Sequence, residues 1–362
     1  MTQFRIANGA CLCVACLRAA RRQARRQEFR IGSTAIFILA LALGLLVMPV
    51  CSEGQQAGKV YRIAFVTVPT RPPATTLAGL EAFRQVLRDR GWIEGKNLAI
   101  ETRTTELDKD LPEVAAQVVR EKFDLIVTVN DPSVLAAKGA TTTIPIVMAG
   151  SGDPVGLGLA GSLARPGGNV TGLTFMAAEV TGKRIELLRE MVPGLRRVAA
   201  VYNPDARTSP FTVDFVTQSE ATARALGITL QRAEVFGADR YDAAFAALKK
   251  DGVGALTVTE GPRYLLHAPQ VAAAALKHRL ATVFPYREQV EAGGLMMYGA
   301  NQIGMWRRAG HFADRILRGA KPADLPVEQP TKFDLFINGK TAKALGLTLP
   351  QSLLIRADEV IQ

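Results

Sequence analysis

The stretch Ser151–Gly172, SGDPVGLGLAGSLARPGGNVTG, separates two parts of the chain that each alternate between strand-like and helix-like patterns. Seven of its 22 residues are glycine, and Asp153 is its only acidic residue. Glycine spacings of this kind also occur in phosphate-binding loops. Here Asp153 and Pro154 follow Gly152, and a carboxylate at the phosphate position would repel the ligand. We therefore interpret the stretch as a turn-rich connection between two α/β lobes.

Before this stretch, short apolar runs alternate with amphipathic patterns of helical period. Strands are expected at Arg62–Val68, Leu98–Thr102, Asp124–Val129 and Ile144–Met148, with helices at about 77–90, 111–122 and 132–139. The order βαβαβαβ is typical of a parallel sheet that helices cover on both faces.

After Gly172 the same alternation starts again. Helices are expected near 181–191, 210–226, 241–248, 269–278 and 303–317, and strands at Arg197–Tyr202, Ile228–Val235, Gly254–Thr259, Ala281–Phe284, Leu295–Tyr298 and Phe333–Ile337. The predicted fold class is α/β, with two Rossmann-like lobes built on parallel sheets. Lobe 1 takes residues 60–172 and a return segment of about 295–330. Lobe 2 takes 173–294, and the segment of about 331–362 is added to it without a firm assignment.

Length and composition indicate an ordinary globular protein of two domains. The chain has 362 residues, 48% apolar and 21% charged. Its net charge is +11, but residues 1–52 alone contribute +6, from seven arginines and Glu28. The remaining excess is mild and scattered along the chain, so we expect no nucleic-acid partner.

The first 52 residues are typical of an export signal or a membrane anchor. An arginine cluster precedes Ile31–Val50, a run of 20 residues without charge. Three outcomes are open: cleavage after Ser52, lipidation at Cys51, or retention as an N-terminal anchor. All four cysteines, Cys11, Cys13, Cys16 and Cys51, lie in this segment, so we expect neither a disulfide nor a thiolate metal site in the remainder.

Candidate binding residues lie in the turns that follow the expected strands, because open parallel sheets bind ligands beyond the carboxyl ends of their strands. They are Pro69, Thr70, Asn130, Asp131, Ser133, Gly152, Asp153, Phe175, Asn203, Glu260, Tyr286 and Tyr298. Asp153 is a candidate partner for a ligand amine, and Asn130, Ser133 and Thr70 for a carboxylate. Phe175, Tyr286 and Tyr298 are candidates to stack on an apolar group. Each also has a structural alternative: Asp153 can cap a following helix, and Tyr298 can be a core residue.

No pattern for catalysis is present in the sequence. Gly182-Lys183 is followed by arginine and not by the Ser or Thr of a nucleotide-binding loop. The first turn, at Pro69, holds no glycine for a dinucleotide, and no Gly-x-Ser-x-Gly elbow occurs. His267, His278 and His311 have no acidic partner at useful spacing. We therefore expect no catalytic residue, no cofactor and no metal.

Several motifs resemble those of ABC transporter substrate-binding proteins of the tryptophan-binding-protein-like family. They are Gly152–Leu173, Phe83–Asn97, Thr143–Val147, Gly182–Leu188, Glu291–Gly299 and Gly319–Phe333, and the likeness extends over about residues 60–362. The resemblance implies the type I periplasmic binding protein fold, with two lobes that close on a ligand about a crossover hinge near Val170–Thr174. The long basic leader departs from the family's usual short one.

The resemblance also implies a function. We expect an extracytoplasmic solute-binding component of an ABC importer that captures a small polar ligand, such as an aromatic or branched amino acid. Its partners would be a permease and an ATPase encoded separately, and the protein itself would be a monomer. An alternative is a ligand-sensing domain that an uncleaved N-terminal helix holds at the membrane. An enzyme is the least favoured of the three interpretations.

Overall fold

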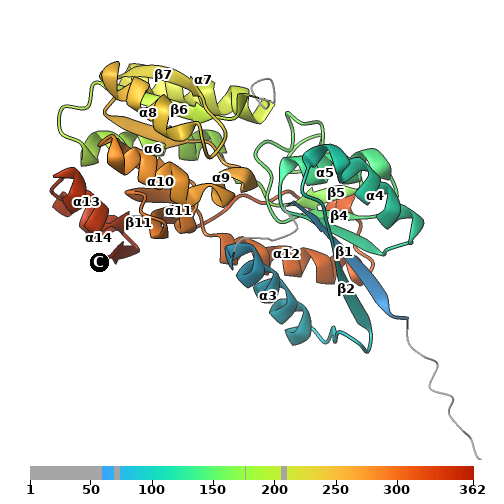
Figure 1. Ribbon diagram of the computed structural model, residues 1–362. Helices are drawn as coiled ribbons and strands as arrows, with labels where there is room; N and C mark the ends of the chain where they lie inside the picture. The colour runs from blue at the N-terminus through green and yellow to red at the C-terminus, as the bar shows by residue number, and fades with distance from the viewer. Residues whose placement is uncertain (1–58, 69–73, 176, 205–209) are drawn as a thin grey trace, which may run out of the picture. The chain divides into compact units, whose positions relative to one another are not determined.

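The computed structural model describes residues 59–68, 74–175, 177–204 and 210–362 (Figure 1). Lys59–Gln362 form one compact unit, which contains two sheets with helices packed against them. The expected export segment, residues 1–52 with Cys51, lies outside the described residues, as do Pro69 and Thr70.

Five parallel strands form the first sheet, in the order β2-β1-β3-β4-β5. They are β1 (Tyr61–Thr67), β2 (Leu98–Thr104), β3 (Leu125–Thr128), β4 (Ile146–Met148) and β5 (Val170–Gly172). Its helical elements are α3 (Ala74–Asp89), η1 (Asp108–Asp110), α4 (Leu111–Arg120), α5 (Asp131–Ala140), α12 (Gln302–Leu317) and η3 (Pro322–Asp324). Successive side chains of a strand point to opposite faces, so Phe65 packs in the core beneath α3 and α12, and Val66 in the core beneath α4 and α5.

Seven strands form the second sheet, in the order β12-β11-β10-β9-β8-β6-β7. They are β6 (Arg197–Tyr202), β7 (Thr229–Glu234), β8 (Ala255–Val258), β9 (Ala281–Phe284), β10 (Met296–Ala300), β11 (Phe333–Asn338) and β12 (Glu359–Ile361). Its helices are α6 (Ala177–Met191), α7 (Pro210–Ala225), α8 (Tyr241–Lys250), α9 (Pro262–Leu266), α10 (Ala268–Lys277), α11 (Arg287–Glu291), α13 (Gly339–Leu345) and α14 (Gln351–Arg356). Val198 and Ala199 again point into different cores on the two faces.

The two sheets share one strand order. In each, the second strand lies at the edge, the first strand is next to it, and the third, fourth and fifth follow. This order is that of a doubly wound α/β sheet, and it confirms the predicted fold class. The second sheet is not entirely parallel, because β11 runs antiparallel to β10.

The placement of β10 differs from our expectation. Met296–Ala300 was assigned to the start of the return segment, at about residue 295. It pairs in parallel with β9 and belongs to the seven-stranded sheet, and α12 is the first element after it that packs in the five-stranded sheet's core. The sequence could not show this, because a short apolar run has the same pattern in either sheet.

Three segments that connect the sheets hydrogen-bond to one another. Leu173 forms a parallel bridge with Glu328, and the Thr174 N–H donates to the Glu328 carbonyl over 3.0 Å. The Asn301 N–H donates to the Lys332 carbonyl, also over 3.0 Å. The hinge that we expected near Val170–Thr174 thus begins with a strand, β5, and the connecting backbone starts at Leu173.

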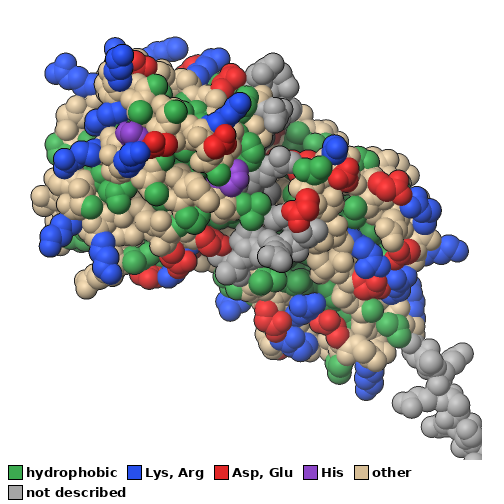
Figure 2. Space-filling view, viewed as in Figure 1, with side chains coloured by type: hydrophobic (Ala, Val, Ile, Leu, Met, Phe, Trp, Pro, Cys, Tyr) green, Lys and Arg blue, Asp and Glu red, His purple; other side chains and the backbone are tan. Residues whose placement is uncertain are grey.

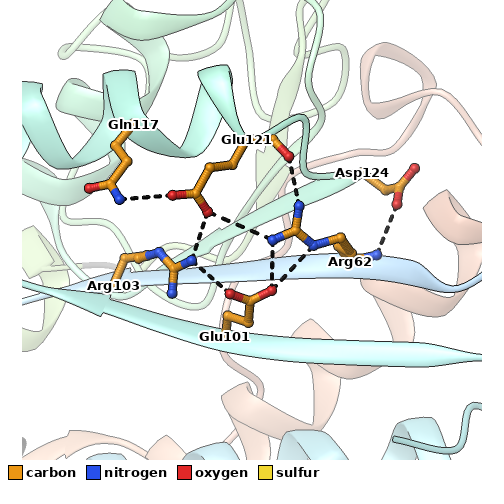
Figure 3. A network of polar contacts seen from close by, with 6 residues as sticks. All are labelled: Arg62, Glu101, Arg103, Gln117, Glu121 and Asp124. Atoms are coloured by element: carbon orange, nitrogen blue, oxygen red, sulfur yellow. Dashed lines mark hydrogen bonds and ion pairs between the residues drawn. The ribbon is translucent and has the colours of Figure 1, made fainter. Parts of the chain in front are cut away.

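A network of charged side chains joins α4 to β1 and β2 (Figure 3). Arg103 contacts both Glu101 (2.6 Å) and Glu121 (2.7 Å), and Arg62 contacts Glu101 over 2.8 Å. The two guanidinium groups hold the pKa of Glu101 below its usual value. All of these side chains are partly solvent-exposed, so we interpret the network as local support for the helix rather than as a binding site.

Charges of both signs are spread over the face of the molecule that Figure 2 shows. Lys and Arg side chains lie over both sheets' helices, with Asp and Glu side chains among them. This distribution agrees with the mild net charge outside residues 1–52.

Candidate functional site

A cavity of about 300 Å³ lies at the carboxyl ends of strands from both sheets. Residues that follow β1, β3 and β4 line it from the five-stranded sheet, and residues that follow β6, β8 and β9 from the seven-stranded sheet. The volume falls within the range of small-molecule sites. In each sheet the strand order reverses between the first and third strands, and this is where doubly wound folds bind ligands.

Asp131 provides a carboxylate to the cavity from the five-stranded sheet. It is the first residue of α5, and Asn130 caps that helix by accepting a hydrogen bond from the Ser133 N–H over 2.9 Å. The Asp131 Oδ1 atom accepts hydrogen bonds from the Ser151 hydroxyl (2.5 Å) and from the Gly152 N–H (3.1 Å). Burial nevertheless raises the pKa of Asp131, and the negative charges of Asp153 and Glu260 add to the increase.

Glu260 provides a carboxylate from the seven-stranded sheet, just after β8. Arg184 of α6 lies behind it, with its Nη1 2.6 Å from Glu260 Oε1. The Tyr286 hydroxyl accepts a hydrogen bond from the N–H of the next residue, Gly261, over 3.3 Å. Burial raises the pKa of Tyr286, so this phenol stays protonated at neutral pH.

Aromatic rings form much of the remaining wall. They are Phe175, Phe236, Tyr264, Tyr286 and Trp306. Two of them lie where a glycine leaves space: a Cβ at Gly150 would lie 2.2 Å from the Phe175 ring, and one at Gly79 would lie 2.2 Å from the Trp306 indole. Trp306 also packs on Phe65, with 5.2 Å between ring centroids. Such a wall suits a ligand with a large apolar or aromatic group.

The structure brings seven of the expected site residues together around this cavity. They are Asn130, Asp131, Gly152, Phe175, Asn203, Glu260 and Tyr286. Pro69 and Thr70 lie outside the described residues, although Val68, just before them, lines the cavity.

Three expected residues do not line the cavity. Ser133 is fully buried inside α5. Asp153 accepts a hydrogen bond from the Gly156 N–H over 2.8 Å, so its carboxylate closes a local turn. Tyr298 stacks on Phe333, with ring centroids 5.9 Å apart. The placement of Tyr298 matches its structural alternative, since it packs against a core cluster. Asp153 differs from its alternative, because a turn and not a helix follows it.

Sequence reasoning missed several contributors to the site, among them three aromatic side chains, the Thr259 hydroxyl and Arg184. Phe236, Tyr264 and Trp306 line the cavity, but in the sequence they look like ordinary apolar positions of helices or strand ends. Arg184 was noted only as part of the Gly182–Leu188 motif. The one available signal was a lone arginine beside the apolar residues Ile185, Leu187 and Leu188, all of which are buried.

The fold and the cavity define a two-sheet solute-binding protein of the periplasmic binding protein type. A family model described as ABC transporter substrate binding protein matches residues 65–361. The chain therefore belongs to the family of ABC transporter substrate-binding proteins, which confirms the resemblance seen in the sequence.

Known relatives agree with this assignment. A curated tyrosine-binding protein of Clostridioides difficile is 28% identical over 272 residues, which cover 74% of this chain and 76% of that protein. The crystal structure of an ABC domain in complex with L-Trp from Streptococcus pneumonia is 25% identical, with a TM-score of 0.76, and covers 84% of this chain and all of that one. A conserved domain protein from Vibrio cholerae is 26% identical, also with a TM-score of 0.76, over 83% of this chain and all of that one.

Membership of this family implies a small-molecule ligand and a membrane permease with its ATPase as partners. The family consists of solute-binding proteins rather than enzymes. Among the described residues, no group of His, Cys, Asp and Glu has the arrangement of a metal site. Within the same part of the chain, no helix has the length and apolar character needed to cross a membrane.

Proposed function

We propose that this protein captures an aromatic amino acid outside the cytoplasm and delivers it to the permease of an ABC importer. The observation that carries the proposal is the cavity itself, which five aromatic rings line together with the carboxylates of Asp108, Asp131 and Glu260. The names of two relatives, a tyrosine-binding protein and a domain in complex with L-Trp, support the same ligand class.

The cavity offers a suitable partner for each part of such a ligand. The aromatic wall covers the side chain, and Asp131 and Glu260 attract the ammonium group. Thr259 also lines the cavity, and its buried hydroxyl has no hydrogen-bond partner among the described residues. Such a hydroxyl is a donor suited to the ligand carboxylate, because an unsatisfied buried polar group gains most from a new partner.

Calorimetric titration and thermal shift with a ligand panel test the proposal. The panel holds L-tryptophan, L-tyrosine, L-phenylalanine, L-leucine, L-isoleucine, glucose, adenine and succinate. At a hundredfold excess over its dissociation constant, a ligand is expected to stabilise the protein by about 2.7 kcal/mol. Binding confined to the aromatic amino acids supports the proposal, and binding confined to a sugar, a purine or a dicarboxylate refutes it. Binding of leucine and isoleucine alone would replace the aromatic class by the branched one.

Export and delivery are tested separately from ligand binding. We propose that residues 1–52 direct export and are then removed, so the mature chain begins near Glu53. Sequencing the N-terminus of the protein recovered from its native host decides this point. A mature chain that retains Ile31–Val50 would favour the membrane-tethered sensor instead. Loss of labelled amino-acid uptake on deletion of the gene, with restoration by the intact gene, would support the importer role.

A further inference from the structure

Arg184 is a charged side chain in a place where charge is costly. It lies on α6 with 1% of its side chain exposed, and it heads the largest fully buried side chains of the described residues. A guanidinium stays protonated at every pH that a protein tolerates, so this position carries a permanent buried positive charge.

Two contacts hold the Arg184 guanidinium in place. Its Nε donates a hydrogen bond to the Tyr298 carbonyl of β10 over 2.8 Å, and its Nη1 lies 2.6 Å from Glu260 Oε1. The backbone passes close by at Gly299, where a Cβ would lie 3.6 Å from Nη2. The guanidinium is thus fixed relative to both β10 and the turn after β8.

A buried ion pair of this kind is a poor stabiliser. The cost of removing both charges from water is large, and apolar residues of similar size often give equal or greater stability. Packing alone therefore does not explain why an arginine occupies this position of α6. The function of the ion pair is better sought at its exposed end, which is the cavity.

Glu260 has one carboxylate oxygen left for a ligand. Its side chain is 9% exposed, and Oε1 faces Arg184. Oε2 is buried and has no hydrogen-bond partner among the described residues, while the residue itself lines the cavity. A buried carboxylate oxygen that accepts no hydrogen bond is strongly stabilised when a cationic donor binds to it.

We propose that Glu260 is the anchor for the primary ammonium group of the ligand, and that Arg184 is the positioning residue that holds this carboxylate in its orientation. This inference rests on the proposed function and deepens it, because it assigns the requirement for an amine to one residue. Amino acids and amines satisfy the requirement. Deaminated acids of the same shape do not.

A bound ammonium also affects the carboxylate that enters the cavity from the other sheet. Burial raises the pKa of Asp131, and the negative charges of Asp153 and Glu260 add to the increase. An ammonium group placed at Glu260 offsets part of this repulsion and favours the ionised form of Asp131.

Three indole compounds separate the ammonium group from the rest of the ligand: L-tryptophan, tryptamine, which lacks the carboxylate, and 3-indolepropionate, which lacks the ammonium. Titration calorimetry measures the affinity of each compound for the wild type and for the Glu260→Gln and Glu186→Gln variants. Glu186 is the matched control, because it lies on α6 in an exposed pair with Lys183.

In Glu260→Gln we expect L-tryptophan and tryptamine to bind on the order of a hundredfold more weakly than to the wild type. The same variant is expected to bind 3-indolepropionate more tightly than the wild type does, because Arg184 is then uncompensated.

The outcomes distinguish this inference from the proposed function. If the wild type binds L-tryptophan, and the Glu260→Gln variant binds it with an affinity within threefold of the wild-type value, the anchor is elsewhere and only this inference fails. If the wild type binds 3-indolepropionate as tightly as L-tryptophan, the amine requirement is wrong. If the wild type binds none of the three compounds or any other aromatic amino acid, the proposed function fails and this inference fails with it.

The role of Arg184 has its own readout, rescue of ligand affinity by the conservative variant. In Arg184→Met the Glu260 carboxylate loses the contact that orients it, and we expect L-tryptophan to bind on the order of tenfold more weakly than to the wild type. Since that variant leaves a buried carboxylate unpaired, Arg184→Lys serves as the folded alternative, with partial rescue of the L-tryptophan affinity expected. An L-tryptophan affinity within threefold of the wild-type value in both variants would show that Arg184 only packs.

Discussion

At the scale of single residues, Gly172 determines how closely β5 approaches β4. Its φ of +131° is rarely adopted by residues with a side chain. A Cβ there would lie 2.2 Å from the Met148 carbonyl oxygen, and backbone cannot move aside as a flexible side chain does. The last glycine of the Ser151–Gly172 stretch is therefore required by packing at the edge of the sheet, next to the connection that begins at Leu173.

Gly172→Ala is expected to lower the free energy of unfolding by roughly 2–4 kcal/mol, from backbone strain and the collision together. Urea denaturation measures the loss. Gly91→Ala is the control, since Gly91 also has a positive φ, +89°, but a Cβ added there would meet no heavy atom within 4 Å. That variant should lose only about 1 kcal/mol. Equal losses in the two variants would mean that the Met148 contact is unimportant.

The two aspartates near the cavity should differ in their effect on binding. Asp153 accepts its hydrogen bond from the Gly156 N–H and lies outside the cavity wall, whereas Asp131 lines it. We expect Asp153→Ala to leave the L-tryptophan affinity within threefold of the wild type, and Asp131→Asn to weaken it about tenfold, as loss of one charged contact would. Calorimetric titration measures both. The reverse order would restore Asp153 to the site and remove Asp131 from it.

At the scale of elements, one buried carboxylate joins α12 to the loop that follows α3. Asp314 accepts hydrogen bonds from the Trp92 indole (2.8 Å) and from Arg318 Nε (2.6 Å), and Arg90 lies 3.3 Å away. Burial alone would raise the pKa of Asp314, but the indole and guanidinium donors outweigh it and hold the pKa below its usual value. These contacts fix α12, the helix that carries Trp306 into the cavity wall.

Asp314→Asn is expected to lower Tm at pH 7 by roughly 4–10 °C, which corresponds to about 2–3 kcal/mol for a chain of this size. A carboxylate whose pKa is depressed by folding contributes stability above its unfolded pKa of about 3.9, and that contribution disappears as pH falls through the folded pKa. The difference in Tm between the wild type and the variant should therefore shrink between pH 5 and pH 3. Scanning calorimetry across this range measures it, and a constant difference would contradict the ionic role.

At the scale of the whole molecule, the two tryptophans of the chain report on different regions. Trp306 lines the cavity, whereas Trp92 donates its hydrogen bond to Asp314 and is not part of the cavity wall. In Trp92→Phe, saturating L-phenylalanine is expected to shift or quench the emission of Trp306. The Trp306→Phe variant, in which only Trp92 remains, should show no change at matched occupancy measured by calorimetry. A change in both variants, or in neither, would argue against a ligand beside Trp306.

Much of the architecture was predictable from local patterns. Strand β6 and the alternation on either side of Ser151–Gly172 follow from hydrophobic period and from turn residues. Several short elements were not predicted, among them β5 and β12 with three residues each and α9 and α11 with five. Segments of that length hold too few residues to show a period by themselves, and packing by neighbouring elements stabilises them. Strand β4 is as short, but it lies in the longer run Ile144–Met148 that predicted it.

The sequence by itself determined the α/β class, the alternation of strands and helices, and the turns from which Asp131 and Glu260 reach the cavity. These properties depend on local periodicity and on the rule that parallel strands end at one edge of a sheet. Only the tertiary structure decided that Asp153 faces its own turn, that β10 joins the second sheet, and that Arg184 and Trp306 support the site. The reason is physical: a helix residue reaches a cavity only through the packing of its helix, and the partners Arg184 and Glu260 lie far apart in sequence. No local pattern records such a contact.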